Sequence, residues 1–79
     1  MTRSELLEKI SEILGEIVEM DDLHLAETTK AEDVQDWDST NHVRLLVAIE
    51  STFGIRFETD QIGGLQNVGQ LLDLVESKL

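Results

Sequence analysis

The first eighteen residues have the apolar spacing of an amphipathic helix. Glu5, Glu8, Glu12 and Glu16 lie on its polar side, which we expect to be solvated. Apolar side chains recur every three or four residues, at Leu6, Leu7, Ile10, Ile13, Leu14, Ile17 and Val18. This spacing predicts a helix from about Ser4 to Val18. Thr2 and Glu5 fit a capping box at its start.

Two further helices are predicted in the second half of the chain. Asp38 is a natural N-cap for a helix from about Ser39 to Thr52, and Gly54 stands where such a helix would end. The apolar face expected for this helix is Val43, Leu46, Val47, Ile49 and Phe53. Asn67 can cap a last helix from about Val68 to Lys78, in which Gly69 would permit close approach of a neighbour. Its expected core face is Val68, Leu71, Leu72 and Val75.

The remaining segments show no sustained periodicity. Residues 19–37 are expected to form an ordered crossing loop that is held by four apolar anchors, Met20, Leu23, Leu25 and Val34. Ile55 and Phe57 are expected to pack under the helices, and residues 59–62 to form a short turn stopped by Gly63-Gly64. The predicted fold class is therefore all-α. It is a small bundle of three long helices plus one short helix, in a single domain over residues 1–79.

Composition narrows the range of partners. The chain has 79 residues, with 6 Lys and Arg against 17 Asp and Glu, and a net charge of −11. This balance argues against nucleic acid or an anionic membrane and favours partners with basic docking patches. The absence of Cys excludes disulfides and thiolate catalysis. No apolar run approaches the roughly 18–20 residues of a membrane span, and the start lacks a signal-peptide pattern, so we expect a cytoplasmic monomer.

The sequence gives only weak evidence for calcium binding, zinc binding or hydrolysis. Asp33, Asp36 and Asp38 cluster, but the spacing of a calcium loop fails beyond two of these acids, so capping is the better interpretation. His24 and His42 are the only imidazoles, too few for a recognisable zinc site, and we expect no metal. A Ser39–His42 dyad is conceivable. However, no Gly-x-Ser-x-Gly elbow surrounds the serine, so a small hydrolase remains only an alternative.

Two residues near the second helix have a possible functional role. Trp37, the sole Trp, either packs the loop onto the bundle or serves as an exposed aromatic in a partner interface. Asp38 already provides the cap, so the hydroxyl of Ser39 is free to point outward from the first turn. A phosphate attached there would sit against free N–H groups and the positive end of the helix dipole. A modified serine, used as a handle, suits a small acidic protein without a catalytic pocket.

The motif around this serine resembles that of acyl carrier proteins and of the similar peptidyl and D-alanyl carrier proteins. The family has Asp-Ser-Leu at the start of its second helix, and this chain has Asp38-Ser39-Thr40. Phe53-Gly54-Ile55 matches the end of the family's helix, and Asn67-Val68-Gly69 resembles the opening of its last helix. The resemblance covers nearly the whole chain.

This resemblance implies a 4′-phosphopantetheine group on Ser39. In the family a phosphopantetheinyl transferase attaches the group from coenzyme A with magnesium, and its thiol holds acyl groups as thioesters for acyl-loading and acyl-processing enzymes. The carrier itself is then not an enzyme. Asp38 matches the motif's acid and is expected to help the transferase dock or bind metal. We expect the partner interface to comprise Trp37, Thr40, Asn41, His42 and Arg44.

Two departures from the family pattern bear on the pathway. Thr40 replaces an apolar Leu, and after Asp38 the second helix carries only Arg44 and Glu50 as charged residues. Both favour a specialised fatty acid, polyketide or nonribosomal-type pathway over primary fatty acid synthesis. Besides the small hydrolase, the other alternative is an unmodified relative of the carrier fold that acts as an interaction adaptor.

Overall fold

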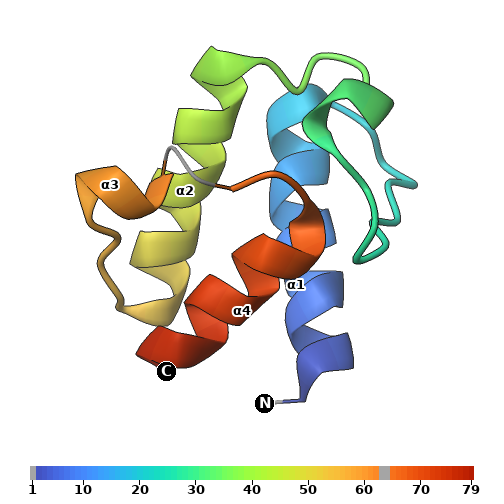
Figure 1. Ribbon diagram of the computed structural model, residues 1–79. Helices are drawn as coiled ribbons and strands as arrows, with labels where there is room; N and C mark the ends of the chain where they lie inside the picture. The colour runs from blue at the N-terminus through green and yellow to red at the C-terminus, as the bar shows by residue number, and fades with distance from the viewer. Residues whose placement is uncertain (1, 63–64) are drawn as a thin grey trace.

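Three long helices form the frame of the protein. The structure, a computed structural model, describes residues 2–62 and 65–79. The long helices are α1 (Arg3–Val18), α2 (Ser39–Phe53) and α4 (Val68–Lys78), and α3 (Thr59–Ile62) is short (Figure 1). A 3₁₀ turn, Ala31–Asp33, interrupts the loop between α1 and α2. No strand occurs in the described ranges, so the all-α prediction is confirmed. The expected stop at Gly63-Gly64 lies outside the described residues.

Each long helix begins at the cap that the sequence predicts. The N–H of Glu5 donates to the Thr2 hydroxyl at 3.2 Å, and the Glu5 carboxylate accepts from the N–H of Thr2 at 3.0 Å. Asp38 and Asn67 cap α2 and α4 in the same way, through side-chain oxygens that accept backbone N–H groups. Gly54 ends α2 with a φ of 67°, in the left-handed region that favours glycine.

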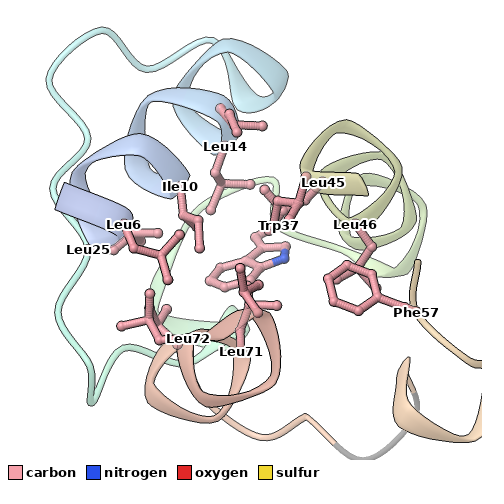
Figure 2. Close-up of a cluster of buried hydrophobic side chains, with 14 of the residues drawn as sticks. Leu6, Ile10, Leu14, Leu25, Trp37, Leu45, Leu46, Phe57, Leu71 and Leu72 are labelled. Atoms are coloured by element: carbon pink, nitrogen blue, oxygen red, sulfur yellow. The ribbon is translucent and has the colours of Figure 1, made fainter. Parts of the chain in front are cut away.

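The core lies where α1, α2 and α4 meet (Figure 2). All three helices contribute side chains that are almost wholly buried, among them Leu6, Ile10, Leu14, Leu45, Ile49, Leu71, Leu72 and Val75. Leu25 and Trp37 from the loop and Phe57 after α2 are also buried, and Ile55 is partly buried, so the expected packing of residues 55 and 57 is confirmed. None of the helices in the described part of the chain is long and apolar enough to cross a membrane.

The buried face of α2 differs from the prediction. Leu46 and Ile49 are buried as expected, together with Leu45. Val43 and Val47, however, are 53% and 56% exposed, so their assignment to the core was wrong. The helix is apolar on several sides, and periodicity alone does not decide which side packs against α1.

The long loop is ordered through contacts with both α1 and α4. The N–H of Leu25 donates to the buried Ser11 hydroxyl at 3.0 Å, and the N–H of Gly69 donates to the Glu27 carbonyl at 2.8 Å. A Cβ at Gly69 would lie 3.0 Å from that carbonyl oxygen, so the close approach predicted at Gly69 is confirmed. Leu25 anchors the loop, but Met20 is 40% exposed and the prediction that it is an anchor was wrong.

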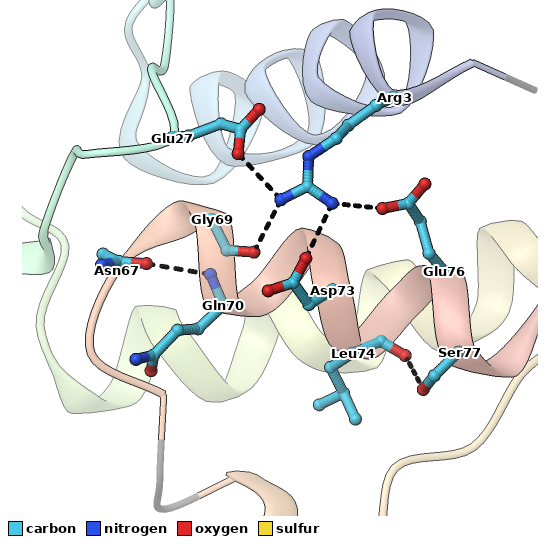
Figure 3. A network of polar contacts seen from close by, with 9 residues as sticks. All are labelled: Arg3, Glu27, Asn67, Gly69, Gln70, Asp73, Leu74, Glu76 and Ser77. Carbon is cyan, nitrogen blue, oxygen red and sulfur yellow. Dashed lines mark hydrogen bonds and ion pairs between the residues drawn. The ribbon is translucent and has the colours of Figure 1, made fainter.

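Arg3 joins three parts of the chain. Its guanidinium donates to the Glu27 carboxylate at 2.8 Å and to the Gly69 carbonyl at 3.1 Å, and pairs with Asp73 at 2.8 Å and with Glu76 (Figure 3). The hydrogen bond to Glu27 is the main cause that raises the pKa of Arg3, and the same bond lowers the pKa of Glu27. This network ties the start of α1 to the loop and to α4, and the start of α2 lies at the opposite end of the molecule (Figure 1).

Candidate functional site

Ser39 is the first residue of α2, and its side chain is exposed. Asp38 provides the cap, because its carboxylate accepts the N–H of Asn41 at 2.9 Å. The predicted capping role of Asp38 is thereby confirmed. Among the hydrogen bonds of the described residues, none uses the Ser39 hydroxyl. The Ser39 hydroxyl is thus exposed at the start of α2, without a hydrogen bond to another described residue.

The backbone that leads to Ser39 is held by the helix it precedes. Asp36 has a φ of 67°, a left-handed conformation that Asp tolerates better than most residues. The side-chain amide of Asn41 donates to the Asp36 carbonyl at 2.7 Å and fixes this bend. Asn41 is half-buried and its amide is used within the chain, so it positions the serine rather than offering a free surface group.

Trp37 and His42 form a pair beneath the site. Trp37 is 7% exposed, and its indole Nε1–H donates to Nδ1 of His42 at 3.1 Å. Burial lowers the pKa of His42, which favours the neutral imidazole that can accept this bond. Trp37 therefore packs the loop onto the bundle, and the alternative of an exposed aromatic is wrong. His42, expected at the surface, is half-buried.

This pair does not support hydrolase chemistry. No hydrogen bond joins Ser39 to His42 in the part of the chain that the structure describes, and Nδ1 of His42 is occupied by Trp37. A cavity of about 30 Å³ beside His42 is lined by Trp37, Leu65 and Leu71, among others, but not by Ser39. That volume suits about one or two water molecules rather than a substrate.

The acidic cluster before α2 has structural roles. Asp33 accepts the N–H of Lys30 at 2.9 Å at the 3₁₀ turn, and Asp38 caps α2. Within residues 2–62 and 65–79, no three His, Asp or Glu side chains come together as a metal site would require. Capping thus accounts for two of the three acids.

Sequence reasoning missed the apolar surface beside Ser39. Val43 lies one turn after Ser39 and Val47 one turn after Val43, and both valines are more than half exposed. Of the residues expected at the interface, Thr40 and Arg44 are also exposed. The signal was present in the four-residue spacing from Ser39, but both valines had been assigned to the core.

Comparison with known proteins gives relatives along the full length of the chain. An acyl carrier protein from Petrotoga mobilis is 32% identical over 79 residues, which cover all of this chain and 93% of the relative. An acyl carrier protein from Thermosynechococcus vestitus is 31% identical over 80 residues, which cover all of this chain and 98% of the relative. No family model matches the chain.

Solved structures agree with these relatives. The solution structure of a holo acyl carrier protein from Geobacter metallireducens has a TM-score of 0.83 and 35% identity, over 91% of this chain and 83% of that one. The crystal structure of an acyl carrier protein from Thermotoga maritima has a TM-score of 0.85 and 28% identity, over 96% of this chain and 88% of that one. Sequence and fold thus lead to one conclusion: this chain belongs to the acyl carrier protein family, whose members are carriers and not catalysts.

Proposed function

We propose that this protein carries acyl or amino-acyl groups on a 4′-phosphopantetheine arm attached to Ser39. The observation that carries the proposal is the exposed, unengaged hydroxyl of Ser39 beside a cap that Asp38 already fills. When bound, the arm supplies a thiol that holds an acyl group as a thioester. This chain has no Cys and so no thiol of its own.

The surroundings of Ser39 fit a phosphodiester. The N–H groups of a helix's first turn lack partners within the helix, and the helix dipole is positive at that end. A phosphate on the Ser39 oxygen would meet both features. Asp38 remains bonded to the N–H of Asn41, so the cap does not depend on the state of the serine. We assign the Asp38 carboxylate a second role in recognition by the transferase.

The partner interface is proposed to extend from Ser39 along the exposed side of α2. Val43 and Val47 supply apolar contact there, and Thr40 and Arg44 lie on the exposed surface around them. A small apolar patch with a polar rim is the usual composition of a protein interface. The net charge of −11 attracts enzymes with basic docking patches, so phosphopantetheinyl transferases and acyl-processing enzymes are the expected partners.

The pathway is proposed to be a specialised one, of fatty acid, polyketide or nonribosomal type. Thr40 replaces the apolar residue of the family motif, and Arg44 and Glu50 are the only charged residues of α2. Enzymes that recognise an acidic α2 would find few charges on this one. The acyl transferase of primary fatty acid synthesis should therefore load this carrier at least about tenfold more slowly than its own carrier. Equal rates would contradict a specialised role.

The attachment itself is tested with coenzyme A, Mg²⁺ and a promiscuous transferase, followed by the intact mass of the protein. We expect the mass of one phosphopantetheine group to be added to the native chain and to Ser51→Ala, a matched change on the same helix. Ser39→Ala should gain nothing. Failure with several transferases would favour the unmodified adaptor. Ester hydrolysis by the unmodified protein that Ser39→Ala abolishes would favour the hydrolase.

A further inference from the structure

The loop after α1 runs back beside this helix (Figure 1). A groove of about 570 Å³ lies between α1 and residues 20–25 of the loop. Leu7 and Leu23, both partly buried, give it apolar lining. Gly15 also lines it, and a Cβ there would lie 2.7 Å from the carbonyl oxygen of Met20. The missing side chain thus lets the chain turn back closely along the helix. The result is an open groove that no segment of the described chain fills.

Met20 lines this groove and is not used by the core. Its side chain is 40% exposed, although the loop around it is ordered by Leu25 and its bond to Ser11. A flexible, polarizable Met at the surface suits contact with a partner better than an exposed branched residue does. The groove therefore contains apolar surface, that of Met20, which remains exposed in the folded protein.

The rim of the groove is acidic. Its lining includes no Lys or Arg but five exposed carboxylates, those of Glu8, Glu12, Glu16, Asp21 and Asp22. The three Glu follow one another every four residues on α1, so they form a row with steps of about 6 Å and a total length of about 12 Å. Lys9 pairs with Glu12 at 3.6 Å. In the described residues, no ion pair engages Glu8 or Glu16.

We propose that this groove binds an amphipathic helix of a protein partner that carries Lys or Arg at four-residue intervals. Such spacing places the cations on one stripe of the partner helix, which matches the row of Glu side chains on α1. Apolar residues next to that stripe would enter the lining formed by Leu7, Met20 and Leu23. A metal ion is a poorer occupant, because no three carboxylates of the described chain converge as ligands.

Binding at the groove would leave the proposed attachment site open. None of the residues that line the groove belongs to α2, so the proposed contact does not use Ser39, Val43 or Val47. The groove would thus act as a holding contact that keeps the carrier in an assembly while other enzymes use Ser39. Groove binding requires no modification of Ser39, so it can fail or succeed independently of the proposed function.

The probe is a synthetic Leu-Lys helix with Lys at every fourth position, titrated into the isotope-labelled full-length protein and followed by NMR. We expect saturable binding, with shift changes in residues 7–25 and little change in residues 39–53. A matched peptide with every Lys replaced by Gln should bind at least about tenfold more weakly. Equal binding of the two peptides would make the groove a site for apolar ligands, which contradicts the proposal.

Charge variants locate the contact. Glu8→Lys combined with Glu16→Lys should weaken binding at least about tenfold. Glu58→Lys combined with Asp60→Lys makes the same change in net charge at exposed residues outside the groove, and should weaken binding no more than about threefold. Equal losses in both double variants would show unspecific attraction, and shift changes centred on α2, or no saturable binding, would also overturn the proposal.

An uncharged pair of variants tests the apolar part of the contact. Met20→Gln should weaken binding about threefold or more, because it removes an apolar side chain from the groove without changing the charge. Leu79→Gln removes an exposed apolar side chain that does not line the groove, and should leave binding unchanged. An unchanged affinity in Met20→Gln would contradict the predicted apolar contact.

Discussion

Leu46 and Val47 are neighbours in α2, yet Leu46 is 2% exposed and Val47 is 56% exposed. The two side chains are chemically similar, so the difference comes from the side of the helix on which each lies. Leu46 belongs to the buried core, whereas Val47 and Val43, one turn apart, lie on the exposed side of α2. One apolar face stabilises the fold. The other stabilises it little, because its side chains remain in water, and neighbouring exposed apolar side chains are typical of an interaction site.

The largest expected effect is the loss of stability when Leu46 is truncated, compared with the same change at Val47. Leu46→Ala should lower the free energy of unfolding by about 2–5 kcal/mol, because it removes buried methyl groups and leaves a cavity. Val47→Ala should change it by no more than about 0.5 kcal/mol, since most of its side chain already contacts water. Urea unfolding followed by circular dichroism measures both. Equal losses would mean that the two faces of α2 do not differ as described.

For recognition by the transferase, we expect the exposed side of α2 to matter and not the buried one. Val43→Gln combined with Val47→Gln should lower kcat/KM for loading by the transferase about tenfold. Each half-exposed Val contributes about 0.7 kcal/mol of apolar burial in the interface. The two together contribute about 1.4 kcal/mol, which corresponds to a factor of ten. Leu79→Gln, at another exposed apolar residue, is the control and should load at the native rate. An unchanged rate in the double variant would remove the exposed face of α2 from the proposed interface.

Asp38 caps α2 and is also proposed to be recognised by the transferase. Two substitutions separate these two roles. Asp38→Ala removes the cap and should cost about 1 kcal/mol in the free energy of unfolding. Asp38→Asn keeps a capping oxygen and should cost only a few tenths of a kcal/mol. If the transferase recognises the charge, both variants load slowly. Native loading of Asp38→Asn would show that the residue only caps the helix.

The smallest expected effect is the contribution of the half-buried His42 to the pH dependence of stability. Burial lowers its pKa in the folded state, so the unfolded chain binds this proton more readily. The stability that His42 contributes is therefore present above its ordinary pKa of about 6.5 and is lost as pH falls through the lowered value. Protonated Nδ1 also cannot accept from Trp37.

His42→Gln isolates this contribution, because Gln offers an acceptor but does not titrate. Between about pH 7.5 and pH 5.5, the melting temperature of the native protein should fall relative to that of the variant. The fluorescence of Trp37, the sole Trp, reports on the same pair. Parallel pH profiles for the two proteins would show that the Trp37–His42 bond contributes nothing to the pH dependence.

The starts of the helices could be predicted from sequence because their causes are local. Thr2, Asp38 and Asn67 each bond to a backbone N–H three residues further on, so a short segment contains the whole signal. The free hydroxyl of Ser39 could be inferred in the same way from the cap beside it. Family resemblance then gave this hydroxyl its proposed chemistry.

The orientation of α2 and the partners of distant residues could not be predicted. Apolar residues lie on several sides of α2, so only the packing of the helix into the core decides that Val43 and Val47 face outward. Arg3 bonds to a carboxylate 73 positions away, and the pairing of Trp37 with His42 depends on how the loop closes over the core. These contacts depend on tertiary structure, and no local pattern specifies them.

The identity of the attachment site is tested most directly by fragment mass spectrometry of the protein after reaction with transferase and coenzyme A. We predict that every modified fragment contains Ser39, with one phosphopantetheine group per chain. Ser4, Ser11, Ser51 and Ser77, which lack a preceding Asp at a helix start, should remain unmodified. A phosphopantetheine group on any other residue, or one that persists in Ser39→Ala, would contradict the assignment of the attachment site to Ser39.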